Sequence, residues 1–553
     1  MSKKTLIEVL HMLIALGIVS AYLYAISLFK PEYVILFRSV VWSRVYSIDS
    51  TYGILILLVM VLISICVYAI GRFEVVKLIK ASVYVLAILT IIGGLPLAYW
   101  IAYIWSPQVS RDHSLIRLSE LDACLFHVYA PVYPLLLLVT LYAWLLPMIA
   151  KAFKGHVRLK VRCNRIVGAG GGYNSLNNML TERLGLTFAL FLSVALPLIP
   201  YIPFINPTFK PASVDIQGYA TFLDNVLMRD PLSALEYVFY SWFWGRMLYI
   251  LMLYGLVGLG IPREAVLNFE ALLIAPLLTL AVYFSAKRLS GEGSYAALAS
   301  LAAVLGFNMT VNMFGGFFAN WTALTLFYIC IGLTPSLIEG NVKSLTICII
   351  ASTATFYTHT WTWSILMATL TAYLALSTLE SLRSGRLTVN KHLLTLLIVN
   401  AAVDLLKNSL TPGRSGLTAS ATTLGRSVGF ENLLNLAWSL NRLTRTYLGG
   451  LLFNPLHMLL ALIGILSMFK RRGEYSKLIL IWVAVASTPF LFANVALQSR
   501  LLLVIPFPIL IAEGLWALSR LLARFDSKLP RLLQVFFIVS SLTYAVRALC
   551  NLV

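Results

Sequence analysis

Apolar runs of about twenty residues, the length of a membrane-spanning helix, recur from residue 5 to residue 550 with no long polar stretch between them. The 553-residue chain is 60% hydrophobic and only 12% charged, whereas about a quarter of the residues in a soluble domain are charged. Transmembrane β-strands alternate polar and apolar residues over about ten positions, which these runs do not. The sequence therefore predicts an all-α, polytopic transmembrane helical bundle.

About fifteen segments have the length and hydropathy of a span. We place them near residues 5–29, 51–70, 81–105, 123–150, 185–204, 269–286, 293–312, 321–338, 344–359, 361–379, 392–408, 451–468, 478–495, 501–520 and 533–550. The first run is longer than the core of a signal peptide, so we expect it to be retained. The segment 247–261 is apolar but short, which favours an interfacial or re-entrant helix over a crossing.

The distribution of Lys and Arg predicts the orientation. Most of the 42 basic residues fall in the short loops on the side of the N-terminus, and basic loops mark the cytoplasmic face. We therefore expect a multi-pass protein of the cell (plasma) membrane with a cytoplasmic N-terminus and with the long loops 205–245 and 409–450 outside. The net charge of +20 is then a topology signal and a contact with anionic headgroups, and nucleic acid is not an expected partner.

A basic stretch at 151–184 divides the chain into a four-span module, 1–150, and a larger membrane domain, 185–553. It contains the glycine-rich sequence GAGGGYNS (168–175), but Tyr173 replaces the last glycine of a dinucleotide-binding pattern. A flexible cytoplasmic connector is therefore favoured over a phosphate site. The module 1–150 carries little chemistry of its own, which leaves binding of a membrane partner, a lipid or an acceptor as its role.

Two features of the outer loops suggest chemistry. Asp215 lies shortly after the fifth span, at the start of an amphipathic stretch 219–228, where a carboxylate beside aromatic residues serves either as a general base or as a helix N-cap. The loop 409–450 and its flank carry five Lys and Arg against one acidic residue, including Arg414 and Arg426. This excess either binds an anionic ligand such as a lipid phosphate or is tolerated because the loop is long.

Five segments resemble the GT-C glycosyltransferases, which include the oligosaccharyltransferase catalytic subunit, the protein O-mannosyltransferases and the lipid A aminoarabinose transferase. One is the loop that begins with Asp215. The others are AVYFSAKRLSG (281–291) with the turn GGFFANW (315–321), FYTHTWTW (356–363), and LQSRLLLVIPFPILIAEGL (497–515). The resemblance covers about 185–520 and implies a GT-C-like core to which residues 1–150 are an addition.

The resemblance implies an inverting transfer of a sugar from a polyprenyl-phosphate-linked donor to an acceptor protein, lipid or glycan at the extracytoplasmic face. Asp215 then corresponds to the catalytic carboxylate and Arg500 to a late basic residue that holds the lipid phosphate, assisted by Arg414 and Arg426. Arg500 is also explained as a snorkelling side chain at a helix end. The expected sugar or acceptor pocket comprises His359, Trp361, Trp363, Tyr219 and Asn320, although tryptophans here also suit an interfacial aromatic belt.

The chain departs from the family at its acidic residues. Gln217 stands where an Asp-x-Asp pair would hold a divalent metal, and the turn around 308–321 has no acid. The six cysteines are scattered without metal or redox spacing. We therefore expect no metal site, doubt any dependence on a divalent metal, and find no other cofactor indicated. Asp224 and Asp230 are expected to be solvated surface charges.

Two other functions fit a chain of this kind. A transporter or lipid flippase would use intramembrane charges, for which Glu513 and Asp404 are candidates. A non-catalytic subunit of a larger membrane complex would use the long loops as docking surfaces. A shared outward position of Asp215, His359 and Arg500 would favour the transferase. The glycosylation patterns at Asn308 and Asn320 lie too close to the bilayer for the pattern to predict modification.

Overall fold

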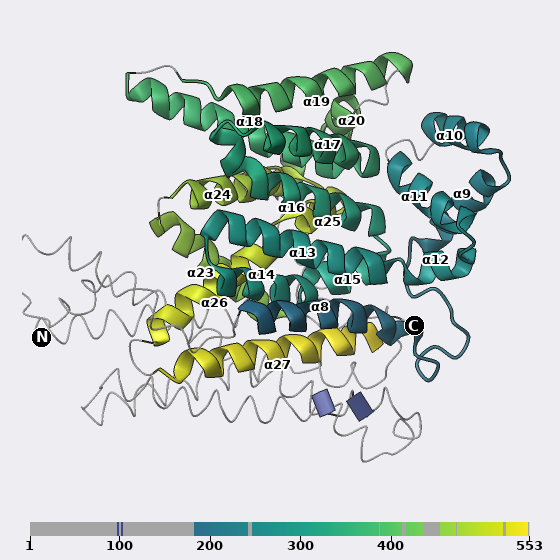
Figure 1. Ribbon diagram of the computed structural model, residues 1–553, viewed down its shortest axis with the longest axis horizontal. Helices are drawn as coiled ribbons and strands as arrows, with labels where there is room; N and C mark the ends of the chain where they lie inside the picture. The colour runs from purple at the N-terminus through teal and green to yellow at the C-terminus, as the bar shows by residue number, and fades with distance from the viewer. Residues whose placement is uncertain are drawn as a thin grey trace, which may run out of the picture. The chain divides into compact units, whose positions relative to one another are not determined.

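The computed structural model describes residues 97–98, 101–102, 182–241, 246–385, 388–411, 416–434, 454–471, 473–523, 527–550 and 552. Within these ranges the secondary structure is helical, apart from one isolated bridge between Val428 and Ala493 (Figure 1). The predicted spans at 5–29, 51–70, 81–105 and 123–150 lie outside the described ranges except for residues 97–98 and 101–102, as does the connector 151–184 up to its last residues. The prediction of an all-α fold is confirmed for the described part of the chain.

Seven helical segments in the described part are long and apolar enough to cross a membrane: Glu182–Tyr201, Arg263–Ser290, Gly293–Gly315, Phe318–Ile338, Thr360–Arg383, Lys391–Leu410 and Leu529–Cys550. The pair Leu497–Val504 and Phe507–Leu522, bent by 56°, is an eighth if it forms one span. Pro506 lies at the bend, where a proline cannot continue the hydrogen-bond ladder. The chain is thus a membrane protein, and the total of about fifteen spans stays a prediction.

The chain forms two compact units. One contains Glu182–His457, Gly464–Glu513 and Tyr544–Val553, and it holds every candidate site residue in the described ranges. The other contains Met1–Thr181, Met458–Ile463 and Gly514–Thr543. The following description concerns the first, called here the site unit.

The site unit is built on a row of packed helices. In the row, α8 (Glu182–Leu198) packs on α13 (Ala271–Ser290) and α14 (Gly293–Leu305), α13 packs on α16 (Phe318–Ile338), and α16 packs on α17 (Val342–Thr358). Next come α18 (Thr360–Arg383) and α19 (Lys391–Leu410), with α24 (Glu474–Ser487) against α18.

The remaining helices of the described part outside the lobe are α15 (Phe307–Gly315), α20 (Gly416–Ser427), α21 (Phe430–Leu434), α23 (Pro455–Arg471), α25 (Val495–Val504), α26 (Phe507–Leu522) and α27 (Leu529–Cys550), with 3-10 turns η5 (Ile199–Tyr201) and η8 (Pro489–Phe492).

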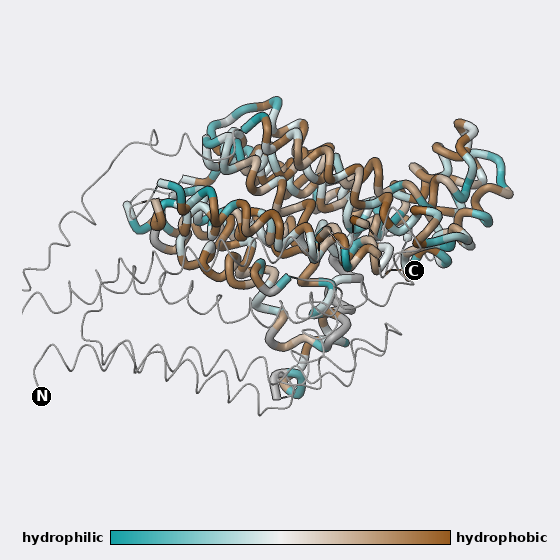
Figure 2. The backbone as a smooth tube through the Cα atoms, turned by 90° about the horizontal axis from the view of Figure 1, so that it is seen from below, coloured by the Kyte–Doolittle hydropathy of each residue, from teal (hydrophilic) through white to brown (hydrophobic). Residues whose placement is uncertain are grey.

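The helix α14 packs against α8 and α13, and all its residues from Tyr295 to Leu305 are buried. Its sequence is rich in alanine, and such small side chains let neighbouring helices approach closely where lipid supplies no hydrophobic drive. Figure 2 shows the helices of the described part as mainly apolar tubes whose polar residues lie toward their ends.

Four short helices form a lobe beside the row, at one end of its helices: α9 (Ile216–Leu227), α10 (Pro231–Tyr240), α11 (Met247–Gly258) and α12 (Arg263–Phe269) (Figure 1). The predicted amphipathic stretch is α9, which buries Ile216, Tyr219, Phe222, Leu223 and Val226. The apolar segment 247–261 is α11. Its 12 residues extend about 18 Å, against a hydrocarbon core of about 30 Å, as expected for a helix that does not cross.

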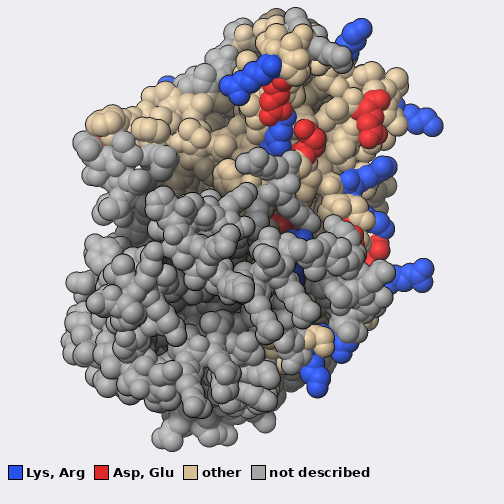
Figure 3. Space-filling model, turned by 90° about the vertical axis from the view of Figure 1, so that its left-hand side faces the viewer, with Lys and Arg blue, Asp and Glu red and all other residues tan. Residues whose placement is uncertain are grey.

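The ends of the row's helices that lie away from the lobe are charged. Lys287 near the end of α13 forms an ion pair with Glu182 at the start of α8, and Lys477 in α24 pairs with Glu380 near the end of α18. Figure 3 views this end and shows Lys, Arg, Asp and Glu side chains distributed over the described surface. The predicted span 478–495 was wrong at its end, because α24 stops at Ser487, just before Pro489.

Candidate functional site

The loop that carries Asp215 is fixed to the turn after α15. The segment 213–215 runs along residues 313–315, and each of its residues donates one hydrogen bond to the carbonyl oxygen of the residue one hundred positions later. Ser213 donates through its hydroxyl group, and Val214 and Asp215 donate through their backbone N–H groups at 3.0 and 3.1 Å. Two segments that the sequence singled out separately thus form one structure.

Gly316 makes this close approach possible. It ends α15 in the left-handed conformation with φ of 70°, which a residue with a side chain rarely adopts. A Cβ atom on Gly316 would lie 3.2 Å from both the Cβ and the backbone nitrogen of Asp215. Gly316 is therefore needed both for the left-handed turn and for the space that Asp215 occupies.

The interpretation of Asp215 as a helix cap was wrong. Asp215 precedes α9 but is itself in the right-handed helical conformation, with φ of −80° and ψ of −7°, and its side chain makes no capping hydrogen bond. A capping residue is normally extended, as Asp230 is, whose carboxylate accepts from the N–H groups of Leu232 and Ser233 at the start of α10. The carboxylate of Asp215 is half-buried and is not used for capping.

Two guanidinium groups act on the Asp215 carboxylate. Burial raises the pKa of Asp215, and the positive charges of Arg246 and Arg500 oppose that rise by favouring the ionised form. Arg246 directly precedes α11, and Arg500 is an exposed residue of α25. One carboxylate and two guanidinium groups thus share one end of the site unit, and among these three groups positive charge exceeds negative by one.

The position of Arg246 is set by Tyr219. Arg246 donates a hydrogen bond to the Tyr219 hydroxyl group, and its guanidinium carbon lies 5.2 Å from the Tyr219 ring centroid, within cation–π range. Tyr219 is buried on α9 and contacts the ring of Tyr249 edge-on at 5.2 Å between centroids. The hydroxyl group of Tyr249 in turn donates to the buried carboxylate of Glu270. Tyr219, expected to line a pocket, therefore holds a charged residue in place.

His359 lies in the electric field of the same two arginines and is held by hydrogen bonds to Thr362. The charges of Arg246 and Arg500 act on its ring. His359 stands between α17 and α18, where its Nδ1 accepts a hydrogen bond from the backbone N–H of Thr362 at 3.3 Å. A neutral ring whose Nδ1 is an acceptor carries its proton on Nε2. The Thr362 hydroxyl group lies 2.8 Å from Nδ1 and donates to Oδ1 of Asn320 at 2.6 Å, which ties the two loops together.

The two tryptophans of the 356–363 motif differ. Trp363 is buried, its indole N–H donates to Asn400 at 3.0 Å, and its ring packs against Phe356 at 4.8 Å, so it anchors α18 to α19 and α17. Trp361 is only partly buried, and its indole N–H has no hydrogen-bond partner among the described residues. Of the pair, Trp361 retains a group that a ligand can use.

The described part of the loop 409–450 is linked to the helix that bears Arg500. Asn494 donates its backbone N–H to Ser427 at 2.8 Å, and Gly429 donates to Phe492 at 3.0 Å, so α20 is linked to the start of α25. The Asn494 side chain then caps α25, the helix that bears Arg500. Of the expected phosphate-binding residues in the loop, Arg426 is exposed on the last turn of α20, and Arg414 lies outside the described residues.

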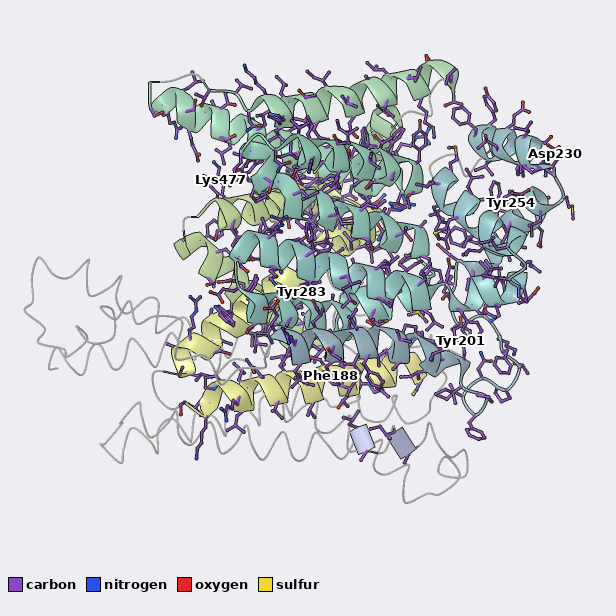
Figure 4. The ribbon with its side chains drawn as sticks, in the orientation of Figure 1. Phe188, Tyr201, Asp230, Tyr254, Tyr283 and Lys477 are labelled. Carbon is purple, nitrogen blue, oxygen red and sulfur yellow. The ribbon has the colours of Figure 1, made fainter. Side chains whose placement is uncertain are left out.

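The spare carboxylates of the lobe are used locally. Asp224 pairs with Arg263 at 2.8 Å, and Asp230 caps α10 at the far edge of the lobe (Figure 4). The prediction that they are surface charges is confirmed for Asp230, which is exposed, whereas Asp224 is partly buried, and both have structural partners. Among the described residues, no three His, Cys, Asp or Glu side chains gather as metal ligands, and the expectation on metal stays a prediction.

Arg246 is the residue that the sequence did not indicate. It ends the aromatic run SWFWGR, and a cation between an aromatic run and a short apolar helix is the signal that could have identified it. Comparisons with protein-family models and with curated proteins found no match to this chain. The functional argument therefore depends on the site itself.

Proposed function

We propose that the protein is an inverting membrane glycosyltransferase, which transfers a sugar from a polyprenyl-phosphate-linked donor to an acceptor at the extracytoplasmic face. The observation that carries the proposal is the gathering of Asp215, Arg246, Arg500 and His359 at one end of the site unit. A base and a set of fixed cations are the two parts that displacement of a lipid phosphate from a sugar needs. The resemblance of the flanking motifs to GT-C glycosyltransferases supports the same assignment.

In the proposed reaction, Asp215 accepts the proton of an acceptor hydroxyl group, whose oxygen forms a bond to the anomeric carbon of the sugar. The bond from that carbon to the phosphate oxygen breaks on the opposite face, and the phosphate leaves with the electron pair. A single displacement of this kind inverts the anomeric configuration. Arg246 and Arg500 stabilise the charge that develops on the phosphate, because guanidinium groups stay ionised and bind its oxygens in pairs.

The excess positive charge suits this substrate. Before the donor binds, the two guanidinium groups exceed the one carboxylate by a single charge, and a lipid-linked phosphodiester brings one negative charge. After transfer the departing phosphate monoester carries more charge, so the cations bind the product side of the reaction more strongly. Interactions that strengthen as charge develops are those that accelerate the chemical step.

The alternative of a transporter or flippase receives less support. Glu513 is buried, but Ser467 donates a hydrogen bond to it at 2.7 Å, and Asp404 accepts one from the backbone of Gly416. Both intramembrane carboxylates thus have a structural explanation. A non-catalytic subunit would need neither the carboxylate nor the two guanidinium groups at one place.

The proposal is tested in proteoliposomes supplied with radiolabelled polyprenyl-phosphate-linked glucose, mannose or galactose. A transferase moves label from the lipid phase into an acceptor or water and releases unlabelled polyprenyl phosphate. A flippase moves the intact lipid between leaflets without cleaving it. Intact label that only changes leaflet, or label that does neither with any donor, would contradict the proposal.

A further inference from the structure

Three asparagines are buried in apolar surroundings around the turn that seats Asp215. Asn308 and Asn312 lie one turn apart on α15, and Asn320 lies in the first turn of α16. Their exposed fractions are 2%, 0% and 4%. Burial of a polar amide is unfavourable unless hydrogen bonds compensate for the water it loses.

Several amide atoms of these asparagines have no hydrogen-bond partner among the described residues. Neither Oδ1 nor Nδ2 of Asn312 has a hydrogen-bond partner there, nor does Nδ2 of Asn308 or of Asn320. By contrast, Asn400, also buried, donates to Ser352 and accepts from Trp363. Since nearly all buried amides in folded proteins are bonded, these four open positions, which no described residue fills, are available to a bound ligand.

The open amides adjoin the proposed catalytic groups. The carbonyl oxygen of Asn312 accepts the N–H groups of Gly316 and Phe317, so Asn312 is one turn before the glycine that contacts Asp215. Asn320 is three residues beyond Phe317, and its Oδ1 is held by the Thr362 hydroxyl group that also contacts His359. The open Nδ2 of Asn320 is therefore oriented by the His359 side of the site.

We propose that the amides of Asn312 and Asn320, with Asn308, bind the hydroxyl groups of the transferred sugar. An amide offers one acceptor and two donors, and a sugar hydroxyl group both donates and accepts, so the two are complementary without any charge. The partly exposed Phe314 and Phe317 flank this turn, on the side from which we propose that the sugar enters. This inference rests on the proposed function, because it assigns the sugar of that donor to these residues.

The test compares Asn312→Leu with Thr369→Val. Thr369 is also fully buried with an unbonded hydroxyl group, but it lies ten residues beyond His359 along α18, about 15 Å away. Both substitutions remove an uncompensated polar group, so both proteins should be at least as thermally stable as wild type. Only Asn312→Leu should lose activity, with kcat/KM for the lipid-linked sugar falling about tenfold or more.

A binding measurement separates this inference from the proposed function. Thermal unfolding is followed with polyprenyl-phosphate mannose, glucose or galactose and with bare polyprenyl phosphate. The unfolding temperature of wild type should rise more with the best glycosylated carrier than with bare polyprenyl phosphate. The unfolding temperature of Asn312→Leu should rise equally with both. Equal gains in wild type, or unchanged kcat/KM in Asn312→Leu, would overturn the sugar site while leaving phosphate binding intact. No gain by wild type from any carrier would overturn the proposed function, and the sugar site with it.

Discussion

Asp215 donates its backbone N–H to the carbonyl oxygen of Gly315 at 3.1 Å, and this bond fixes the candidate base to the turn between two packed helices. A catalytic group needs a position defined by rigid elements, and here a loop acquires one by running along the end of α15. The neighbouring Gly316 leaves the space in which the Asp215 backbone lies.

Substitution Gly316→Ala should therefore reduce transfer as well as stability. Its φ of 70° costs an alanine about 1 kcal/mol, and the added Cβ would contact Asp215 at 3.2 Å. The matched control is Gly385→Ala, where φ is 79° and no atom of the described residues lies within 4 Å of the added Cβ. Thermal unfolding should show similar losses for both variants, whereas only Gly316→Ala should lower kcat. Equal activity of the two would contradict the role of the turn in placing Asp215.

Substitution Arg246→Gln should change the pH dependence of transfer. The base acts when Asp215 is ionised, and the positive charge of Arg246 lowers the pKa that burial raises. Without that charge the pKa of Asp215 rises further, so the acid limb of the rate–pH profile should move to higher pH. Arg263→Gln is the control, because Arg263 pairs with Asp224 on the lobe. An acid limb that stays in place in Arg246→Gln would show that Asp215 is not the group that titrates.

Arg500 tests the choice between phosphate binding and snorkelling. A snorkelling residue needs only a positive charge on a long side chain, so Arg500→Lys would behave as wild type. A residue that binds phosphate oxygens in pairs loses that geometry in lysine, and the KM for the lipid-linked donor should then rise about tenfold. Arg288→Lys, in the last turn of α13, provides a control with the same chemical change. Donor titrations at fixed acceptor concentration give KM and kcat for each variant.

The orientation can be tested by labelling single cysteines in a background without the six native ones. Met228 at the end of α9 is 82% exposed, and Val342 at the start of α17 is 65% exposed. A membrane-impermeant maleimide added to intact cells should label Met228→Cys and should reach Val342→Cys only after permeabilisation. The reverse pattern would place the site on the cytoplasmic face and exclude an extracytoplasmic transfer.

The sequence was informative where hydropathy alone decides structure. The runs 269–286, 321–338 and 392–408 predicted α13, α16 and α19 to within a few residues, because a long apolar run in a membrane has few alternatives to a helix. Prolines change the bounds of two other predicted spans. The helix α24 ends before Pro489, and the predicted span 501–520 is bent at Pro506. Those breaks depend on single prolines, which hardly change the hydropathy averaged over a span of about twenty residues.

The site could be predicted only in part. Asp215 was identified as an acidic residue in an outer loop near a span end, and Arg500 was identified through the resemblance to the GT-C glycosyltransferases; the charge of Arg500 acts on Asp215. Trp363 was assigned to a pocket because its partner, Asn400, lies on another helix that local sequence does not reveal. Arg246 and Asn312 were missed for the same reason, since their positions follow from contacts with Tyr219 and with the turn at Gly316.

The central claim is that Asp215 is the base of a sugar transfer, and the rate of label transfer by Asp215→Asn tests it most directly. The amide keeps the size of the side chain and the backbone bond to Gly315 but cannot accept the proton. Removal of a general base typically lowers rates by about 100-fold to 10,000-fold. In proteoliposomes with the donor that wild type uses, Asp215→Asn should therefore bind the lipid but transfer sugar at least 100-fold more slowly. Asp224→Asn, in the same lobe, should transfer at the wild-type rate. Equal rates for wild type and Asp215→Asn would contradict the account.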